Sequence, residues 1–212
     1  MDYLGVVLLV AAVAAAFVVI ARRVIGRGRR ARAERDRQLR LARSAAEADV
    51  NGFGDEMARL AALAEADPAA ADLYTLVSAL HARAQESLRE ARQPDEFSRV
   101  TEVLEEGRWA AARLAARAAG QPMPARRPPC FFNPGHGPST CNIVWRHRSL
   151  PSCAADAIRV RAGADPYIRT VERGGRRVPY WEGGPAYAGW ARGYYSSWWG
   201  NGLVSDIALT KV

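Results

Sequence analysis

The residues best suited to chemistry lie in one short stretch, CFFNPGHGPSTCNIVWRHRSLPSCAAD, which begins at Cys130. Cys130 and His136 flank a tight Pro-Gly turn. Cys153 and Asp156 are three positions apart, so they would share one face at the start of a helix. Thiolate, imidazole and carboxylate groups all bind Zn²⁺ at about 2.0–2.3 Å, and the amino end of a helix favours a thiolate. The spacing therefore predicts a structural zinc site with the ligands Cys130, His136, Cys153 and Asp156.

This arrangement resembles a treble-clef zinc module, in which a knuckle supplies two ligands and a helix start supplies two more. The knuckle spacing, Cys-x5-His, is wider than usual, and aspartate is an uncommon ligand in structural sites. Cys141 or His147 could take the place of Asp156. Without metal, the stretch would be a small β-hairpin domain with incidental thiols. A metal ion would help so small a core to stay folded.

Two other functions are open for this stretch. In an enzyme, Cys130 would be the nucleophile, His136 the base and Asp156 the group that orients the base. No glycine-rich nucleotide loop, nucleophile elbow or paired-acid motif accompanies them, which favours a binding protein over an enzyme. Weak nucleic-acid binding through Trp145-Arg146-His147-Arg148 is the other alternative. One basic-aromatic tetrapeptide is a slight signal, so we expect no nucleic-acid partner.

The elements around the stretch must bring its two halves together. A proline-rich linker, 121–129, separates it from the preceding helices. In the module 130–181 the pattern predicts a short strand at 142–145, a helix at 153–160 and a hairpin that turns at Gly174-Gly175. These elements make the module a small α+β unit.

The tail 182–212 is rich in glycine and aromatic residues and shows no clear period. Its six glycines argue against a stable helix, whereas Trp and Tyr suit the headgroup region of a membrane. We therefore expect a loosely ordered tail that touches the membrane surface. Its exposed aromatic residues would be Tyr194, Tyr195, Trp198 and Trp199.

A helical hairpin or bundle is predicted over 55–120, after a break at Asn51-Gly52-Phe53-Gly54. Its three helices would cover 55–66, 68–92 and 95–119. The third helix carries a heptad seam, and the short turn before it makes it an antiparallel neighbour of the second. The seam consists of Phe97, Val100, Leu104, Gly107, Ala111, Leu114 and Ala118.

The chain starts with an uncharged apolar run, Leu4–Ile20, which is followed by RRVIGRGRRARAERDR. A helix over this run is about 27 Å long, close to the hydrocarbon thickness of a thin bilayer. No Lys or Arg precedes the run and no small-x-small cleavage site follows it. The segment 1–21 is therefore expected to be an uncleaved transmembrane anchor rather than a signal peptide. The charge asymmetry predicts an external amino end and a cytoplasmic C-terminal domain.

The net charge of +8 is concentrated beside this anchor, because ten Arg face three acids in the first 43 residues. We expect Arg22–Arg43 to meet the lipid bilayer and its anionic headgroups. The segment 22–54 would continue as a basic juxtamembrane helix, polar nearly all round, up to its break. In a reducing cytoplasm the three cysteines would be free thiols or metal ligands rather than disulfides.

Four phrases, CFFNPGHGPST, LPSCAADAIRVRAG, RRVPYW and GPAYAGWARGYY, resemble a family of uncharacterised actinobacterial single-pass membrane proteins. Their shared mark is a C-F-F-N/D-P-x-H-G-P segment, and the resemblance is strongest from Cys130 to Tyr195. It implies an N-terminal anchor and a helical middle, and it implies no activity. The patterns together predict a mainly α chain with a small α+β, treble-clef-like C-terminal module. The predicted function is a membrane-anchored cytoplasmic interaction or scaffold protein with an unidentified protein partner.

Overall fold

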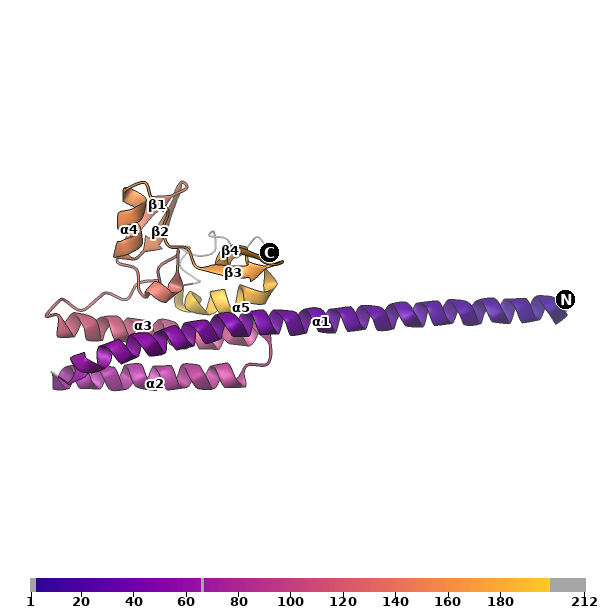
Figure 1. Ribbon diagram of the computed structural model, residues 1–212, viewed down its shortest axis with the longest axis horizontal. Helices are drawn as coiled ribbons and strands as arrows, with labels where there is room; N and C mark the ends of the chain where they lie inside the picture. Colours follow the sequence, from indigo (N-terminus) through magenta and orange to yellow (C-terminus); the bar gives the residue numbers. More distant parts are fainter. Residues whose placement is uncertain (1–2, 66, 199–212) are drawn as a thin grey trace. The chain divides into compact units, whose positions relative to one another are not determined.

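The computed structural model describes residues 3–65 and 67–198; for 3–16, 18, 19, 21 and 69 it describes the backbone alone. The chain divides into two compact units, Met1–Gln38 and Leu39–Val212. Its described part is mainly helical, with two small β-hairpins in the second unit (Figure 1). The helices are α1 (Tyr3–Ala64), α2 (Pro68–Glu90), α3 (Phe97–Ala118), α4 (Ala154–Arg161) and α5 (Pro185–Tyr194). The strands are β1 (Cys141–Trp145), β2 (Arg148–Ser152), β3 (Thr170–Arg173) and β4 (Arg176–Pro179).

The first unit consists of the amino-terminal part of α1. The apolar side chains of Phe17, Ile20, Val24 and Ile25 are each more than half exposed there. Among the residues with described side chains, no helix is long and apolar enough to cross a membrane. Most side chains of the predicted anchor, 1–21, lie outside the described residues. The anchor therefore stays a prediction.

The second unit is built around the hairpin of α2 and α3, which lie side by side (Figure 1). A short turn at Pro94–Glu96 joins them, and the Glu96 carboxylate accepts the backbone N–H groups of Arg92 and Gln93. The predicted seam of α3 is buried, and only Ala118, in the last turn, is exposed. The heptad pattern thus identified both the hairpin and the face that it buries.

Helix α1 runs without interruption through Asn51-Gly52-Phe53-Gly54 to Ala64, so the predicted break is wrong. Phe53 is fully buried, and its ring occupies the space that a side chain at Gly107 of α3 would need. This packing outweighs the roughly 1 kcal/mol by which each glycine disfavours a helix. Tertiary contact, rather than local propensity, decides the conformation here.

The prediction that 22–54 is polar nearly all round fails in the same part of α1. Small and medium apolar residues form a buried stripe there, namely Ala42, Ala46, Val50 and Phe53. Arg43 donates to the carbonyl oxygens of Leu88 and Ala91, which lie at the end of α2. Residues 39–54 of α1 therefore form a third helix of the core, whereas nearly all described side chains of 22–38 are exposed, as predicted.

Residues 185–194 form helix α5, where we expected a loosely ordered tail. Its glycines permit a close approach to the turn before α3 and to α3 itself. A Cβ atom at Gly189 would lie 2.6 Å from the Asp95 Cα atom, and one at Gly193 would overlap the Ser98 carbonyl oxygen. The aromatic side chain directly after each of these glycines, Trp190 and Tyr194, is buried, as is Tyr195 after the helix.

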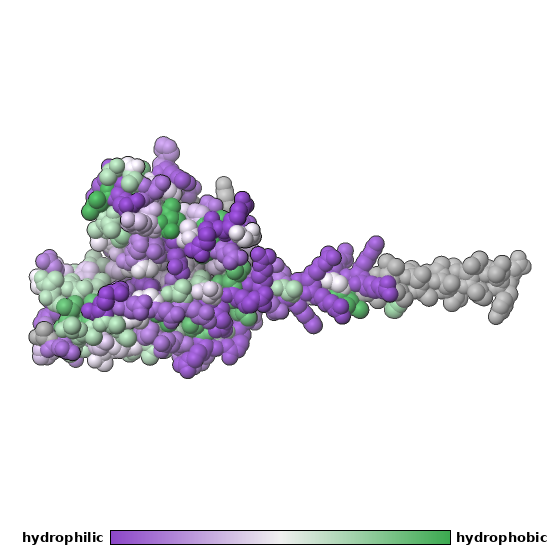
Figure 2. Space-filling view, viewed as in Figure 1, coloured by the Kyte–Doolittle hydropathy of each residue, from purple (hydrophilic) through white to green (hydrophobic). Residues whose placement is uncertain are grey.

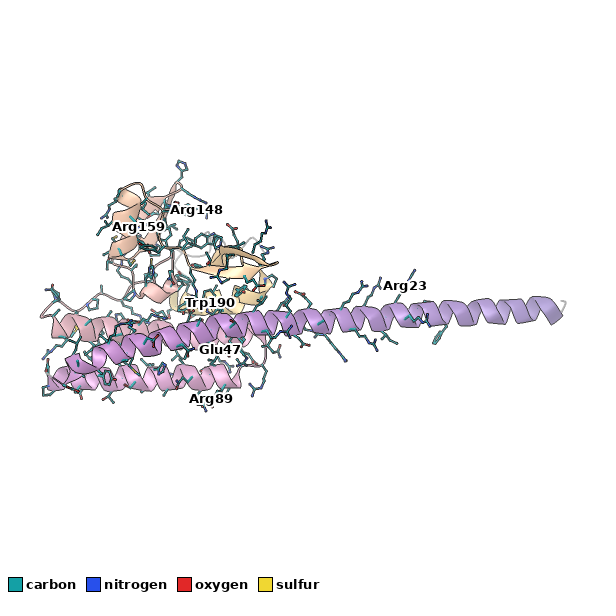
Figure 3. All side chains as sticks on the ribbon, viewed as in Figure 1. Arg23, Glu47, Arg89, Arg148, Arg159 and Trp190 are labelled. Carbon is teal, nitrogen blue, oxygen red and sulfur yellow. The ribbon has the colours of Figure 1, made fainter. Side chains whose placement is uncertain are left out.

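The tail prediction is thus wrong for the described part of 182–212, because its glycines serve helix packing and its aromatic residues fill the core. Trp198 is partly buried, and Trp199 lies outside the described residues. Trp190, labelled on α5 in Figure 3, donates its indole N–H to Asp49 of α1.

Two antiparallel hairpins complete the second unit. Strand β1 pairs with β2, and β3 pairs with β4 through the predicted Gly174-Gly175 turn, where both glycines have positive φ. Helix α4 packs on β1. A second buried cluster lies between these elements and consists of Cys130, Phe131, Phe132, Ile143, Leu150 and Ala157. The linker 121–129 has no helix or strand, as its prolines predict.

Candidate metal centre

A tight turn brings Cys130 and His136 together. The Asn133 side chain caps a short 3₁₀ turn by accepting the Gly135 N–H at 2.9 Å. The Cys130 N–H donates to the Gly137 carbonyl at 3.0 Å, which closes the loop behind His136. Gly137 has φ +79°, a conformation that favours glycine. The sequence NPGHG thus folds back on Cys130 for local reasons.

The other two residues come from the start of α4. Cys153 is the N-cap of this helix, and its sulfur faces the Asp156 N–H at 3.5 Å. The β1–β2 hairpin returns the chain to the first pair, because the Phe131 N–H donates to the Pro151 carbonyl at 2.9 Å. Knuckle, hairpin and helix start therefore meet at one point.

The four predicted residues converge there, and one ligand atom from each lies within 4.8 Å of the other three. Asp156 Oδ2 is 2.9 Å from His136 Nδ1 and 3.3 Å from the sulfur atoms of both Cys130 and Cys153. Cys153 Sγ is 3.6 Å from His136 Nδ1. A tetrahedral Zn²⁺ with bonds of 2.0–2.3 Å places its ligand atoms about 3.3–3.8 Å apart. The spacing of the cluster suits a metal ion of this size.

The charges of the cluster also suit a cation. A hydrogen bond from the Cys130 thiol, with help from His136, lowers the pKa of Cys153 to about 5. The same hydrogen bond, together with burial, raises the pKa of Cys130. Contact with Cys153 and Asp156 raises the pKa of His136. Cys153 and Asp156 therefore carry negative charge at neutral pH, and Cys130 still shares a proton that a metal ion would displace.

Asp156 is held by a contact that sequence reasoning missed. Its side chain is fully buried, which raises the pKa of a carboxyl group, but hydrogen bonds from the Tyr167 N–H and the Cys130 thiol outweigh burial and lower the pKa of Asp156. The Tyr167 N–H donates to Asp156 Oδ1 at 2.8 Å and leaves Oδ2 to face the other three ligands. No sequence signal could have identified this donor, because any residue but proline supplies a backbone N–H.

Cys141 and His147 lie outside the cluster. The Cys141 sulfur is 3.9 Å from the Ser152 carbonyl oxygen, across the β1–β2 pairing. His147 sits in the turn of that hairpin with φ +65°. Neither Cys141 nor His147 therefore replaces Asp156 in the cluster that this fold forms.

The geometry also distinguishes a ligand cluster from a catalytic triad. In a triad the histidine uses one ring nitrogen for the nucleophile and the other for the carboxylate. Here His136 Nδ1 faces both the Cys153 sulfur and Asp156 Oδ2. Cys130, which would be the nucleophile, is fully buried. The arrangement therefore fits four atoms around one ion better than a proton relay to a substrate.

Comparison of the chain with models of protein families, with curated proteins and with solved structures finds no match. The resemblance to actinobacterial membrane proteins therefore remains an expectation. The function must be argued from the chemistry of the cluster and from the sequence around the apolar run.

Proposed function

We propose that the chain is a membrane-anchored cytoplasmic interaction or scaffold protein whose C-terminal module, 130–181, is held together by a structural zinc ion. The zinc ion is inferred from one observation. The ligand atoms of Cys130, His136, Cys153 and Asp156 lie within 4.8 Å of one another. A knuckle, a hairpin and the start of α4 supply them, in the order of a treble-clef module.

A structural role is favoured because the protein itself supplies four ligands. Catalytic zinc sites keep one position open for water or substrate, whereas structural sites are closed and tetrahedral. Cys130 and Asp156 are fully buried, whereas Cys153 is half-buried and His136 is exposed. Such a site stabilises a small module and leaves its surface free to bind a partner.

The anchor is supported by the sequence alone. Leu4–Ile20 contains no charged residue, and seven Arg follow between Arg22 and Arg35. By the positive-inside rule this places the amino end outside and the second unit in the cytoplasm. A reporter enzyme fused after Val212 should be active in the cytoplasm. Activity of the same fusion outside the membrane would overturn both the orientation and the reducing environment that it implies.

The metal is tested on the purified full chain. We expect about one zinc per chain, and we expect its thiols to resist alkylation until a chelator removes the ion. The alternative, a thiol-dependent enzyme, would need Cys153 as its nucleophile in place of the predicted Cys130, because Cys130 is fully buried and the pKa of Cys153 is lowered. A metal-free chain whose Cys153 alone reacts rapidly at neutral pH would favour that alternative and overturn the zinc site.

A further inference from the structure

The chain beyond Arg43 is nearly neutral as a whole, but it consists of two segments whose net charges have opposite signs. Residues 44–121 contain eight Arg and 14 acids, a net charge of −6. Residues 122–212 contain 12 basic residues and five acids, a net charge of +7. The basic side chains next to the anchor are therefore not the only ones available for an anionic partner.

The tip of the β1–β2 hairpin presents part of this positive charge. Trp145 pairs with Arg148, so Arg146 and His147 form a two-residue turn between the strands. Arg146, His147 and Arg148 are all exposed, and Figure 2 shows hydrophilic side chains at the end of this hairpin. In the described part of the chain, no ion pair joins Arg146 or His147 to a carboxylate.

A two-residue hairpin turn of this type requires positive φ at both central residues, yet neither Arg146 nor His147 is a glycine or an asparagine. Arg146 has φ +47° and His147 has φ +65°, the left-handed region in which a side chain costs about 1–2 kcal/mol per residue. Hairpins with this turn strongly prefer Asn-Gly. Residues in such strained conformations are concentrated at functional sites, which indicates a function for the Arg146 and His147 side chains themselves.

An apolar side chain accompanies the charges. Val144 is 71% exposed and lies on the hairpin face opposite to Ile143, which is buried. Trp145 holds the base of the turn, with its ring edge-on to Phe132 at 5.4 Å and covered by the Arg146 guanidinium at 4.3 Å. The tip therefore presents one aliphatic side chain and two guanidinium groups, and the packing of Trp145 fixes their support.

We propose that the hairpin tip, 144–148, is a second membrane-contact site that binds the surface of a bilayer containing anionic lipids. Arginine side chains bind the headgroup phosphates, and Val144 reaches the interface below them. Single-stranded nucleic acid is less well matched, because it needs open aromatic faces for stacking and the Trp145 ring is already covered. The inference rests on the proposed anchor for its strength, since tethering multiplies the effect of a weak contact.

The test uses the full chain in nanodiscs of phosphatidylcholine, with and without phosphatidylglycerol, followed by hydrogen exchange. Phosphatidylglycerol should slow exchange in 143–149 of the wild type. The decisive variant is Arg146→Asn/His147→Gly, which relieves the turn and removes its charge. It should fold at least as well and yet lose this protection, and loss of the Arg146 charge alone should weaken the contact roughly fivefold. The matched control is Arg83→Gln/Arg89→Gln on α2, which should retain protection.

The outcomes separate this inference from the proposed anchor. A chain that inserts into both kinds of nanodisc but shows no lipid-dependent protection of the tip overturns the inference alone. A chain that does not insert overturns the anchor. Binding of the tip to lipid is then tested separately, by adding the same empty nanodiscs to the free chain and measuring the protection of 143–149. Protection of the tip by single-stranded RNA in place of phosphatidylglycerol would also overturn the inference.

Discussion

At the scale of single residues, the metal centre depends on which oxygen and nitrogen atoms are already occupied. Asp156 Oδ1 is used by the Tyr167 N–H, so only Oδ2 can face the cluster. His136 turns Nδ1 toward both Asp156 and Cys153. The site is thus preorganised by its neighbours, and its metal affinity should respond sharply to the loss of one ligand.

Cys153→Ser is expected to lower zinc affinity by on the order of 100-fold or more, because one of four ligands contributes a substantial share of the roughly 10–16 kcal/mol of a structural site. Cys141→Ser is the matched control, since its sulfur lies outside the cluster, and it should bind zinc like the wild type. Competition with a chelating dye measures both. Equal affinity of the two variants would show that Cys153 is not a ligand.

Glu105 gives the helical core a dependence on pH. Burial raises its pKa to about 7, although the Arg126 guanidinium lies 2.5 Å away. Because its pKa is about 4.5 in the unfolded chain, the folded state binds the proton more tightly. The resulting stability is complete below pH 4.5 and is lost as the pH rises through 7, by about 3 kcal/mol.

Glu105→Gln should therefore remove part of the decline in stability between pH 5 and pH 8, as measured by urea denaturation at each pH. Glu102→Gln, an exposed position on the same helix, should leave the decline unchanged. Both variants keep the metal centre, so its own titration cancels from the comparison. Identical pH profiles for the two variants would contradict the raised pKa of Glu105.

The sequence reveals a residue's chemistry more readily than its partners. Cys130, His136, Cys153 and Asp156 were identified because turn and helix-start signals lie close to them in the chain. Asp49, by contrast, looks like any acid on a polar helix. Its environment comes from Arg169, Trp190 and Tyr194, which lie more than a hundred residues away in the chain. No local pattern contains that information.

At the scale of the elements, glycines have opposite effects at different places. A Cβ atom at Gly193 would overlap the Ser98 carbonyl oxygen and the Thr101 hydroxyl of α3. A Cβ atom at Gly52 in α1 would meet nothing within 4 Å. The same residue type therefore permits close helix packing in α5 and merely weakens the helix in α1. Glycine content does not distinguish these two situations. It therefore led to two wrong predictions, the helix break at 51–54 and the loosely ordered tail.

Gly193→Ala should destabilise the chain by about 2 kcal/mol or more, because the backbone of α3 cannot move aside cheaply. Gly52→Ala should instead stabilise it by about 0.5–1 kcal/mol, since alanine favours the helix and the position is open. Thermal denaturation of the two variants provides the comparison. A stabilising effect of Gly193→Ala would mean that α5 does not pack on α3 as described.

At the scale of the second unit, Asp49 joins three parts of the fold. Its Oδ2 accepts from Trp190 Nε1 and the Tyr194 hydroxyl at 2.9 Å each, and its Oδ1 lies 2.8 Å from Arg169. Arg108 of α3 donates to the Asp49 carbonyl oxygen and to the Tyr194 hydroxyl. The Asp49 carboxylate therefore joins α1, α5 and the segment before β3, while α3 is bonded to the Asp49 backbone.

Asp49→Asn should cost about 2 kcal/mol or more, because it leaves the half-buried Arg169 guanidinium without its ion-pair partner. Asp55→Asn, at an exposed position on the same helix, should change stability by less than about 0.5 kcal/mol. Chemical denaturation measures the difference. Equal stability of the two variants would show that the Asp49 carboxylate does not stabilise the core.

The contacts of the second unit also change what removal of the metal should do. The sequence suggests that the 130–181 module would unfold and leave the helices intact. In the structure, the Tyr195 hydroxyl donates to the Cys130 carbonyl and the Tyr180 hydroxyl to the Phe131 carbonyl. These tyrosines lie in the buried cluster of the helices, so the residue that directly follows α5 is bonded to the backbone of a predicted metal ligand.

Chelation of zinc is therefore expected to increase hydrogen exchange in α4 and, to a smaller extent, in α5, while α2 retains its protection. Tyr195→Phe should uncouple α5 from the metal centre, because it keeps the buried ring and removes the hydrogen bond to the Cys130 carbonyl. In that variant, chelation should still loosen α4 but leave α5 closer to its metal-bound protection. If α5 exchanges identically with and without metal in the wild type, the module and the helices are energetically independent despite these contacts.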